Sequence, residues 1–209
     1  LSSSSAASDV YKRQILDEAE IVCATLAGAG HEMLYRYTFD TVVIDEAAQA
    51  VELSTLIPLR YECTRCILVG DPKQLPPTVL SQEAERRQYA QSLFVRMFNA
   101  SPDRVHLLSI QYRMHPEISL FPSTAFYGRQ LIDGPQMASK TLQPWHNTQL
   151  FGPFRFFHVD ALEEPGRSHS IQNQSEAYTA MQVYEALCAC AQTSLRGRVG
   201  FVSMYKACL

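Results

Sequence analysis

The sequence lacks any apolar run that approaches the roughly 20 residues needed by a membrane-spanning helix. It also lacks a recognisable secretion signal, because serines stand near the N-terminus where a signal peptide has its apolar core. Neither sign of charge dominates, since the chain has 18 Lys and Arg and 21 Asp and Glu, which gives a formal net charge of −3. We therefore expect no membrane partner, and any nucleic-acid contact would have to be a local groove.

Cysteine is sparse and poorly spaced for a structural metal. Only Cys63 and Cys66 form a C-x-x-C pair, whereas a structural zinc site usually takes its four ligands from two such pairs. Cys188 and Cys190 lie too close together to be the second pair. The sequence therefore favours reduced thiols over a zinc site. The six cysteines are Cys23, Cys63, Cys66, Cys188, Cys190 and Cys208.

The ends of the chain differ from its interior. Residues 1–14 read LSSSSAASDVYKRQ, which predicts a disordered polar tail and also resembles translated adaptor sequence that is not native. The chain stops at Leu209, just after a strand-like segment. Both observations indicate a partial protein.

Three short apolar runs predict strands at residues 21–25, 41–44 and 66–69. The runs are continuous rather than alternating, which is typical of strands buried on both faces. Helices are predicted at residues 47–56 and 83–99. The second helix carries an apolar stripe at helical spacing that is expected to face the core. The stripe consists of Leu93, Phe94, Met97 and Phe98.

Strands that alternate with helices predict an α/β fold with parallel sheets. The sequence pattern changes after Pro116, where prolines and glycines interrupt the periodicity of the apolar residues. That part predicts strands at residues 154–159 and 199–203 and a helix at residues 175–192. The predicted divisions are a tail at 1–14, a first lobe at 15–110 and a second lobe at 111–209.

The segment FDTVVIDEAAQ carries the first chemical signal. A buried strand that ends in Asp45 and Glu46 places both carboxylates at the carboxyl edge of the sheet, where open α/β sheets bind ligands. One carboxylate can hold Mg²⁺, partly through water, and the other can polarise an attacking water. This is the arrangement of a Walker B element. A solvated acidic pair at the start of the next helix remains the alternative.

Two further segments carry polar clusters. In ILVGDPKQLPP a second strand ends in Asp71, Lys73 and Gln74, and the amide of Gln74 can contact a terminal phosphate or its attacking water. In QYRMHPE, Arg113 can clamp a phosphoryl group, and Tyr112 offers a ring for base stacking. The alternatives are a proline-rich turn and a surface arginine beside a buried tyrosine.

Taken in order, DEAAQ, GDPKQLPP and YRMHP resemble the motifs of the superfamily 1 helicases that include the nonsense-decay helicase. The connecting segments QSLFVRM and FPSTAFYGRQLIDGP are most similar to senataxin-type helicases. The resemblance covers roughly residues 15–206. Three motifs in this order, joined by matching connecting segments, are highly specific for this helicase group.

The resemblance implies a role for each motif residue. Asp45 matches the acid that holds Mg²⁺, Glu46 matches the base that activates water, and Arg113 matches an arginine finger. Gln74 matches a catalytic residue near the terminal phosphate. The residues that the resemblance assigns to nucleotide binding are Gln49, Asp71 and Tyr112. Thr25, in CATLAGAG, matches a contact to the nucleic-acid backbone, with a simple glycine turn as the alternative.

The implied fold is that of a P-loop NTPase, with RecA-like parallel sheets in two incomplete lobes. The implied cofactors are ATP and Mg²⁺, and the implied partners are single-stranded RNA or DNA, or RNA–DNA hybrids. The family further implies a nuclear protein, or otherwise a cytoplasmic one. Two other functions stay open: a helicase-like scaffold that binds proteins without ATPase activity, and a transporter or chaperone motor. The intact motifs argue against both.

The sequence contains no G-x-x-x-x-G-K-[ST] phosphate loop. The final motifs of the helicase family, which include a second arginine finger, are also missing. The chain by itself is therefore expected not to hydrolyse ATP.

Overall fold

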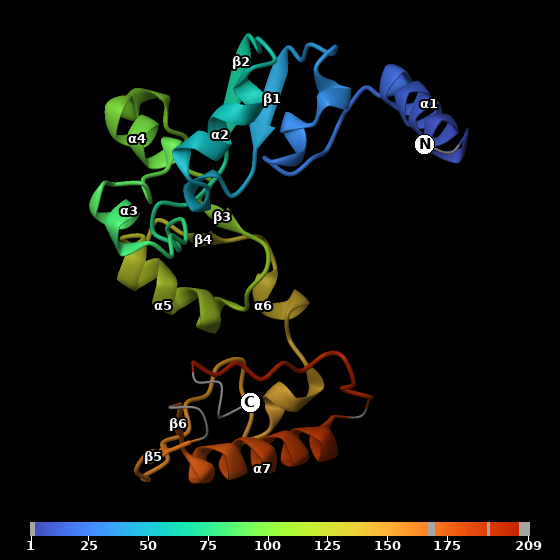
Figure 1. The fold of residues 1–209 in the computed structure, drawn as a ribbon. Coiled ribbons are helices and arrows are strands. Elements are labelled where there is room, and N and C mark those ends of the chain that lie inside the picture. The colour runs from blue at the N-terminus through green and yellow to red at the C-terminus, as the bar shows by residue number, and fades with distance from the viewer. Residues whose placement is uncertain (1–2, 167–169, 192, 205–209) are drawn as a thin grey trace. The chain divides into compact units, whose positions relative to one another are not determined.

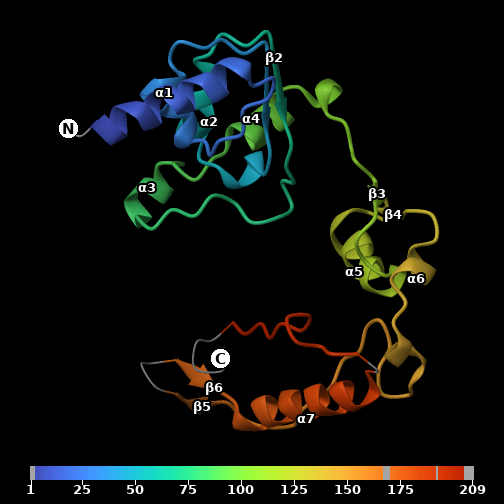
Figure 2. The same ribbon diagram turned by 90° about the vertical axis from the view of Figure 1, so that its right-hand side faces the viewer.

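The computed structural model describes residues 3–166, 170–191 and 193–204. The chain divides into two compact units, Leu1–His106 and Leu107–Leu209, whose elements are labelled in Figure 1 and Figure 2. The sequence predicts the division between residues 110 and 111. That the units are the two lobes of a motor stays a prediction.

The first unit is built around one parallel pair of strands with short helices beside it. Its elements are α1 (Ser3–Glu18), η1 (Gly28–Gly30), η2 (Glu32–Leu34), β1 (Thr41–Ile44), η3 (Ala47–Gln49), α2 (Glu52–Leu59), β2 (Arg65–Leu68), α3 (Gln82–Arg86), α4 (Leu93–Ala100) and η4 (Pro102–Arg104). Its buried apolar residues are Leu34, Ile44, Ala47, Ala48, Tyr61 and Leu93.

The second unit contains a short parallel pair, a short antiparallel pair and one long helix. Its elements are β3 (Ile110–Gln111), α5 (Pro116–Phe126), β4 (Ile132–Asp133), α6 (Met137–Lys140), η5 (Pro144–Asn147), β5 (Glu164–Pro165), β6 (Ile171–Gln172) and α7 (Gln174–Cys190). The helix predicted at 175–192 is confirmed by α7, and residue 192 lies outside the described residues.

Strands β1 and β2 pair in parallel, with Thr41 opposite Arg65 and Ile44 opposite Leu68 (Figure 1). Two backbone hydrogen bonds extend the pairing past the strand ends, from Val69 N to the Ile44 carbonyl and from Ala47 N to the Val69 carbonyl, each 2.8 Å long. Two predicted strands are thus confirmed, the second shifted by one residue. With the parallel pair β3–β4, they confirm the α/β class.

Three predicted strands are wrong. Residues 21–25, 154–159 and 199–203 have no strand structure, although their composition favours it. A strand requires a neighbour for its ladder hydrogen bonds, and no described strand pairs with these segments. Most of their apolar side chains are exposed to solvent: Ile21 is 81% exposed and Val202 is 98% exposed. The predicted disordered tail is also wrong over residues 3–14, because they belong to helix α1.

Each of the two helices predicted in the first unit is interrupted. Ala50 and Val51 adopt extended conformations, so residues 47–56 contain η3 and the start of α2. Gln88 has a left-handed backbone with φ 63°, which separates α3 from α4 within residues 83–99.

The apolar stripe on α4 is only partly buried. Leu93 is 6% exposed, but Met97 is 43% exposed and Phe98 is 37% exposed. The prediction that the whole stripe faces the core is therefore wrong for its C-terminal half. Phe94 and Phe98 stack on each other instead, with ring centroids 6.2 Å apart.

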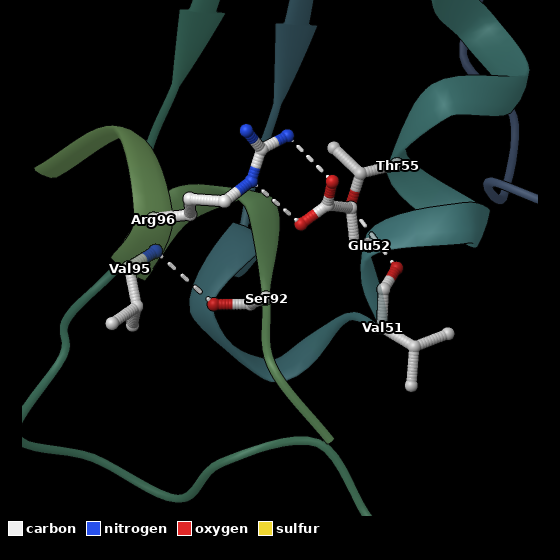
Figure 3. Close-up of polar contacts among 6 residues, drawn as sticks. All are labelled: Val51, Glu52, Thr55, Ser92, Val95 and Arg96. Atoms are coloured by element: carbon white, nitrogen blue, oxygen red, sulfur yellow. Dashed lines mark hydrogen bonds and ion pairs between the residues drawn. The ribbon is translucent and has the colours of Figure 1, made fainter. Parts of the chain in front are cut away.

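Polar contacts fix the start of α4 against the start of α2 (Figure 3). Ser92 is 1% exposed, and its hydroxyl accepts a hydrogen bond from Val95 N at 3.2 Å, which caps α4. The guanidinium of Arg96 donates two hydrogen bonds to Glu52, one of them from Nε at 2.9 Å. This carboxylate raises the pKa of Arg96. Thr55, fully buried, donates to the Val51 carbonyl.

The Ser92 cap gives a stability prediction. Ser92→Ala removes the acceptor for Val95 N and should lower the free energy of unfolding by about 1 kcal/mol in urea denaturation. Ser101 is the control, because it precedes η4 without a side-chain cap. Ser101→Ala should change stability by less than about 0.5 kcal/mol. Equal losses in the two variants would contradict the capping role.

Candidate functional site

Asp45 and Glu46 follow β1 directly and lie on the surface. Glu46 has a left-handed backbone, with φ 51° and ψ 34°, where a residue other than glycine costs roughly 1–2 kcal/mol. This turn is followed at once by the hydrogen bond from Ala47 N to the Val69 carbonyl. The strained residue thus lies where the chain leaves β1 and joins the end of β2. Such strain is found preferentially at functional sites.

The side chains of this loop are organised by hydrogen bonds. Gln49 Nε2 donates to Glu46 Oε2 at 2.8 Å, so an amide orients the carboxylate that the sequence assigns as the base. Asp45 Oδ1 accepts a hydrogen bond from Glu46 N at 2.9 Å. The structure therefore brings Asp45, Glu46 and Gln49 together in one exposed turn.

The loop after β2 repeats this organisation. Asp71 Oδ1 accepts from Lys73 N at 2.9 Å, and Asp71 Oδ2 accepts from Gln74 Nε2 at 3.1 Å. A second amide is thus held by a second carboxylate. The sequence places Asp71 and Gln74 in one cluster, and the structure joins them by this contact.

Gly70 allows the two loops to approach closely. A Cβ atom at Gly70 would lie 2.9 Å from Ala48 N and 3.3 Å from Ala47 N, closer than side chains tolerate against backbone. Because β1 and β2 are parallel, both loops lie at the carboxyl edge of the pair. Oxygen ligands at this edge fit Mg²⁺, which proteins hold through one or two carboxylates together with water and substrate phosphates.

Tyr112 and Arg113 belong to the second unit, directly after β3. Tyr112 is 65% exposed and Arg113 is also exposed. The backbone N–H of Arg113 donates to Gln111 Oε1 at 2.9 Å. Gln111 is buried, and the sequence alone assigned it no role, although it stands within the QYRMHPE segment. The available signal was its place directly before Tyr112 and Arg113 in that segment.

Thr25 stabilises a glycine turn. Its hydroxyl accepts from Gly28 N at 3.0 Å, and its carbonyl accepts from Ala29 N at 2.8 Å. The hydroxyl of Tyr61 donates to the Ala29 carbonyl and ties this turn to the end of α2. A local structural role for Thr25 is therefore present, and its contact with nucleic acid stays a prediction.

Within the described residues, no three His, Cys, Asp or Glu side chains gather in a way that could hold a metal. The described cysteines are free thiols, namely Cys23, Cys63, Cys66, Cys188 and Cys190; Cys208 lies outside the described residues. Burial, followed by the neighbouring Cys63, raises the pKa of Cys66.

Over residues 3–166, 170–191 and 193–204, every helix is too short or too polar to cross a bilayer. A pocket of about 320 Å³ opens in the second unit beside α5. It is lined by Pro116, Glu117, Ser119, Leu120, Ser123, Leu131 and Asp133.

The close approach at Gly70 can be tested by substitution. Gly70→Ala should destabilise the joined loops by about 1–3 kcal/mol, because the new methyl group meets backbone atoms. Hydrogen exchange at the Ala47 amide measures this directly and should accelerate. Gly200→Ala is the control, since a Cβ there meets nothing within 4 Å. Unchanged Ala47 protection in Gly70→Ala would show that the loops do not abut as described.

Comparison with known proteins identifies the family. Two models, each described as an AAA domain, match residues 2–82 and 89–209. Helicase sen1 of Schizosaccharomyces pombe is 48% identical over 94% of this chain. Probable helicase senataxin of Homo sapiens is 34% identical over 92% of it. Regulator of nonsense transcripts 1 of Dictyostelium discoideum is 35% identical over 92% of it. The chain spans only 12%, 8% and 14% of these relatives' lengths. The sequence-based resemblance is confirmed: the chain belongs to the AAA-domain family of P-loop NTPases, with the α/β RecA-like fold, and to its senataxin-like superfamily 1 helicase group.

Proposed function

We propose that this chain is part of the ATP-hydrolysing motor of a helicase that translocates along or unwinds nucleic acid. One observation carries the proposal: two adjacent parallel strands end in carboxylate–amide pairs, Glu46 with Gln49 and Asp71 with Gln74, on loops that abut at Gly70. A carboxylate held by an amide at a sheet edge is suited to orient a water for attack on a phosphate. The relatives that are named as helicases support the proposed helicase activity.

The contacts at this edge support the following proposed role for each residue. Asp45 would hold Mg²⁺, which would neutralise charge on the phosphates when bound. Glu46 accepts the proton of the attacking water, and Gln49 keeps its carboxylate oriented through the 2.8 Å contact. Gln74 contacts the terminal phosphate or the water, with Asp71 as its support.

We assign Tyr112 to stacking on the nucleotide base and Arg113 to stabilising the charge that develops on the transferred phosphoryl group. The exposure of both side chains allows these contacts. We further propose that Thr25 contacts the backbone of single-stranded RNA or DNA, or of an RNA–DNA hybrid, and that the parent protein is nuclear. The names of the relatives state helicase activity and support the nucleic-acid substrate only at that level.

The catalytic assignment is tested in a longer protein in which this chain is joined to a phosphate loop. Glu46→Gln should retain ATP binding and lose turnover, because an amide cannot accept the water's proton. Asp45→Asn should weaken Mg²⁺-dependent ATP binding as well as turnover. Phosphate release and nucleotide affinity, measured side by side, separate the two effects.

Glu20→Gln makes the same chemical change at an exposed residue outside the site and should retain parental turnover. Parental turnover in Glu46→Gln would overturn the assignment of the base. Absence of ATP hydrolysis in the parental protein itself would favour the helicase-like scaffold instead.

The chain as given should not hydrolyse ATP. Phosphoryl transfer depends on positioning and electrostatic stabilisation by several parts acting together. The acidic residues, the amides and one arginine are present, but the sequence has no G-x-x-x-x-G-K-[ST] loop to anchor the phosphates. The measurement is phosphate release by the purified chain with single-stranded nucleic acid. Sustained release that disappears in Glu46→Gln would contradict this prediction.

A further inference from the structure

A polar cluster made of Gln111, Ser119 and Asp133 lies next to the exposed Tyr112–Arg113 turn. Strands β3 and β4 are parallel, and Gln111 stands opposite Asp133 in their register. Asp133 Oδ1 accepts two hydrogen bonds, from Gln111 Nε2 and from the hydroxyl of Ser119, each 2.6 Å long. Gln111 is 9% exposed and Ser119 is 3% exposed. The cluster therefore joins β3, β4 and α5 through two buried side chains, Gln111 and Ser119, and the exposed carboxylate of Asp133.

The side-chain amide of Gln111 is fully used. Its oxygen accepts from Arg113 N at 2.9 Å and from Met114 N at 2.7 Å. Its nitrogen donates to the Met114 carbonyl at 2.8 Å and to Asp133. A primary amide offers two donor hydrogens and two acceptor lone pairs, and all four are engaged here. Among the amino acids, only glutamine has a side chain of this length that both donates and accepts in this way. The turn that carries Arg113 is therefore closed around this one side chain.

Tyr112 is held from the other strand. A Cβ atom at Gly134 would lie 2.5 Å from Cδ1 and Cε1 of the Tyr112 ring and 3.1 Å from the Gln111 carbonyl. The ring therefore lies directly against the backbone at Gly134, while 65% of the residue stays exposed. Gly134 N also donates to the Gln111 carbonyl at 2.9 Å, which fixes the backbone under the ring.

We propose that Gln111 and Asp133 are positioning residues: together they preset the turn that presents Tyr112 and Arg113 to the nucleotide. Both residues act through their neighbours and touch no substrate. The proposal rests on the proposed role of Arg113. A turn fixed in advance keeps the arginine within the narrow geometry that transition-state stabilisation requires, and a misplacement of about 1 Å can cost on the order of 100-fold in rate.

The central variant is Gln111→Glu in the longer protein. The carboxylate keeps the oxygen for Arg113 N and Met114 N but loses both donor hydrogens, and it places a negative charge beside Asp133. We expect kcat for ATP hydrolysis to fall by about 100-fold, with a smaller change in KM for ATP. Gln130→Glu is the matched control on an exposed glutamine of the same unit and should retain parental turnover.

Two variants that carry Asp133→Asn separate the positioning role from a general loss of folding. Asp133→Asn alone keeps an amide oxygen that can accept from Gln111 and Ser119, so it should lower kcat less than Gln111→Glu does. Combined with Gln111→Glu, the same Asp133→Asn substitution supplies an amide donor to the new carboxylate and should recover part of the lost kcat. A purely structural role would instead lower turnover only in proportion to the folded fraction, which denaturation measures for each variant.

Arg113→Lys distinguishes failure of this proposal from failure of the proposed function, because a lysine lacks the planar fork of the guanidinium. If Arg113→Lys abolishes turnover while Gln111→Glu retains it, the positioning proposal is overturned and the arginine assignment stands. If Arg113→Lys keeps full turnover, the arginine assignment fails. Hydrogen exchange at the Arg113 and Met114 amides then decides whether Gln111 still fixes the turn: faster exchange in Gln111→Glu supports it, and unchanged exchange overturns it.

Discussion

The parallel pairing of neighbouring strands is the constraint on which the candidate site depends. Parallel strands end at the same edge, so residues separated in sequence by a whole helix arrive side by side. In the first unit the register of β1 with β2 delivers the Glu46 and Asp71 loops to one edge. The contact at Gly70 then determines how closely the loops can approach. Without that register, the carboxylate–amide pairs would be two unrelated surface turns.

The second unit uses the same constraint in a different way. Strands β3 and β4 contain only two residues each, too few to define a sheet by their backbone alone. A side-chain contact adds to the backbone pairing, because Gln111 and Asp133 stand opposite each other and form a hydrogen bond. The pairing is thus reinforced by a side-chain contact between the buried Gln111 and the exposed Asp133. In the first unit the pairing positions polar groups, whereas in the second the polar groups reinforce the pairing.

The sequence predicted the features that depend on local pattern. Strand β1, strand β2 and helix α7 lie where the apolar runs and the helical periodicity indicate, and the motif carboxylates follow the strands. It failed where structure depends on distant partners. Residues 21–25 and 199–203 have strand composition but no described neighbour to pair with. The exposure of Val43, at 61%, shows that even β1 leaves apolar surface uncovered in the described part of the chain.

In the candidate site, too, the sequence could not predict contacts that depend on folding, here between single side chains. Motif matching predicts roles for Glu46 and Arg113 because the proposed chemistry depends on their functional groups. It cannot show that Glu46 adopts a left-handed backbone or that the Arg113 turn closes around Gln111, since both depend on atoms brought together by folding. A buried amide with all four hydrogen-bonding positions engaged tolerates almost no substitution, because each lost partner leaves an unsatisfied group. The residues that hold the Arg113 turn in place can therefore be as restricted in chemistry as the side chains that this turn exposes, although no motif singles them out.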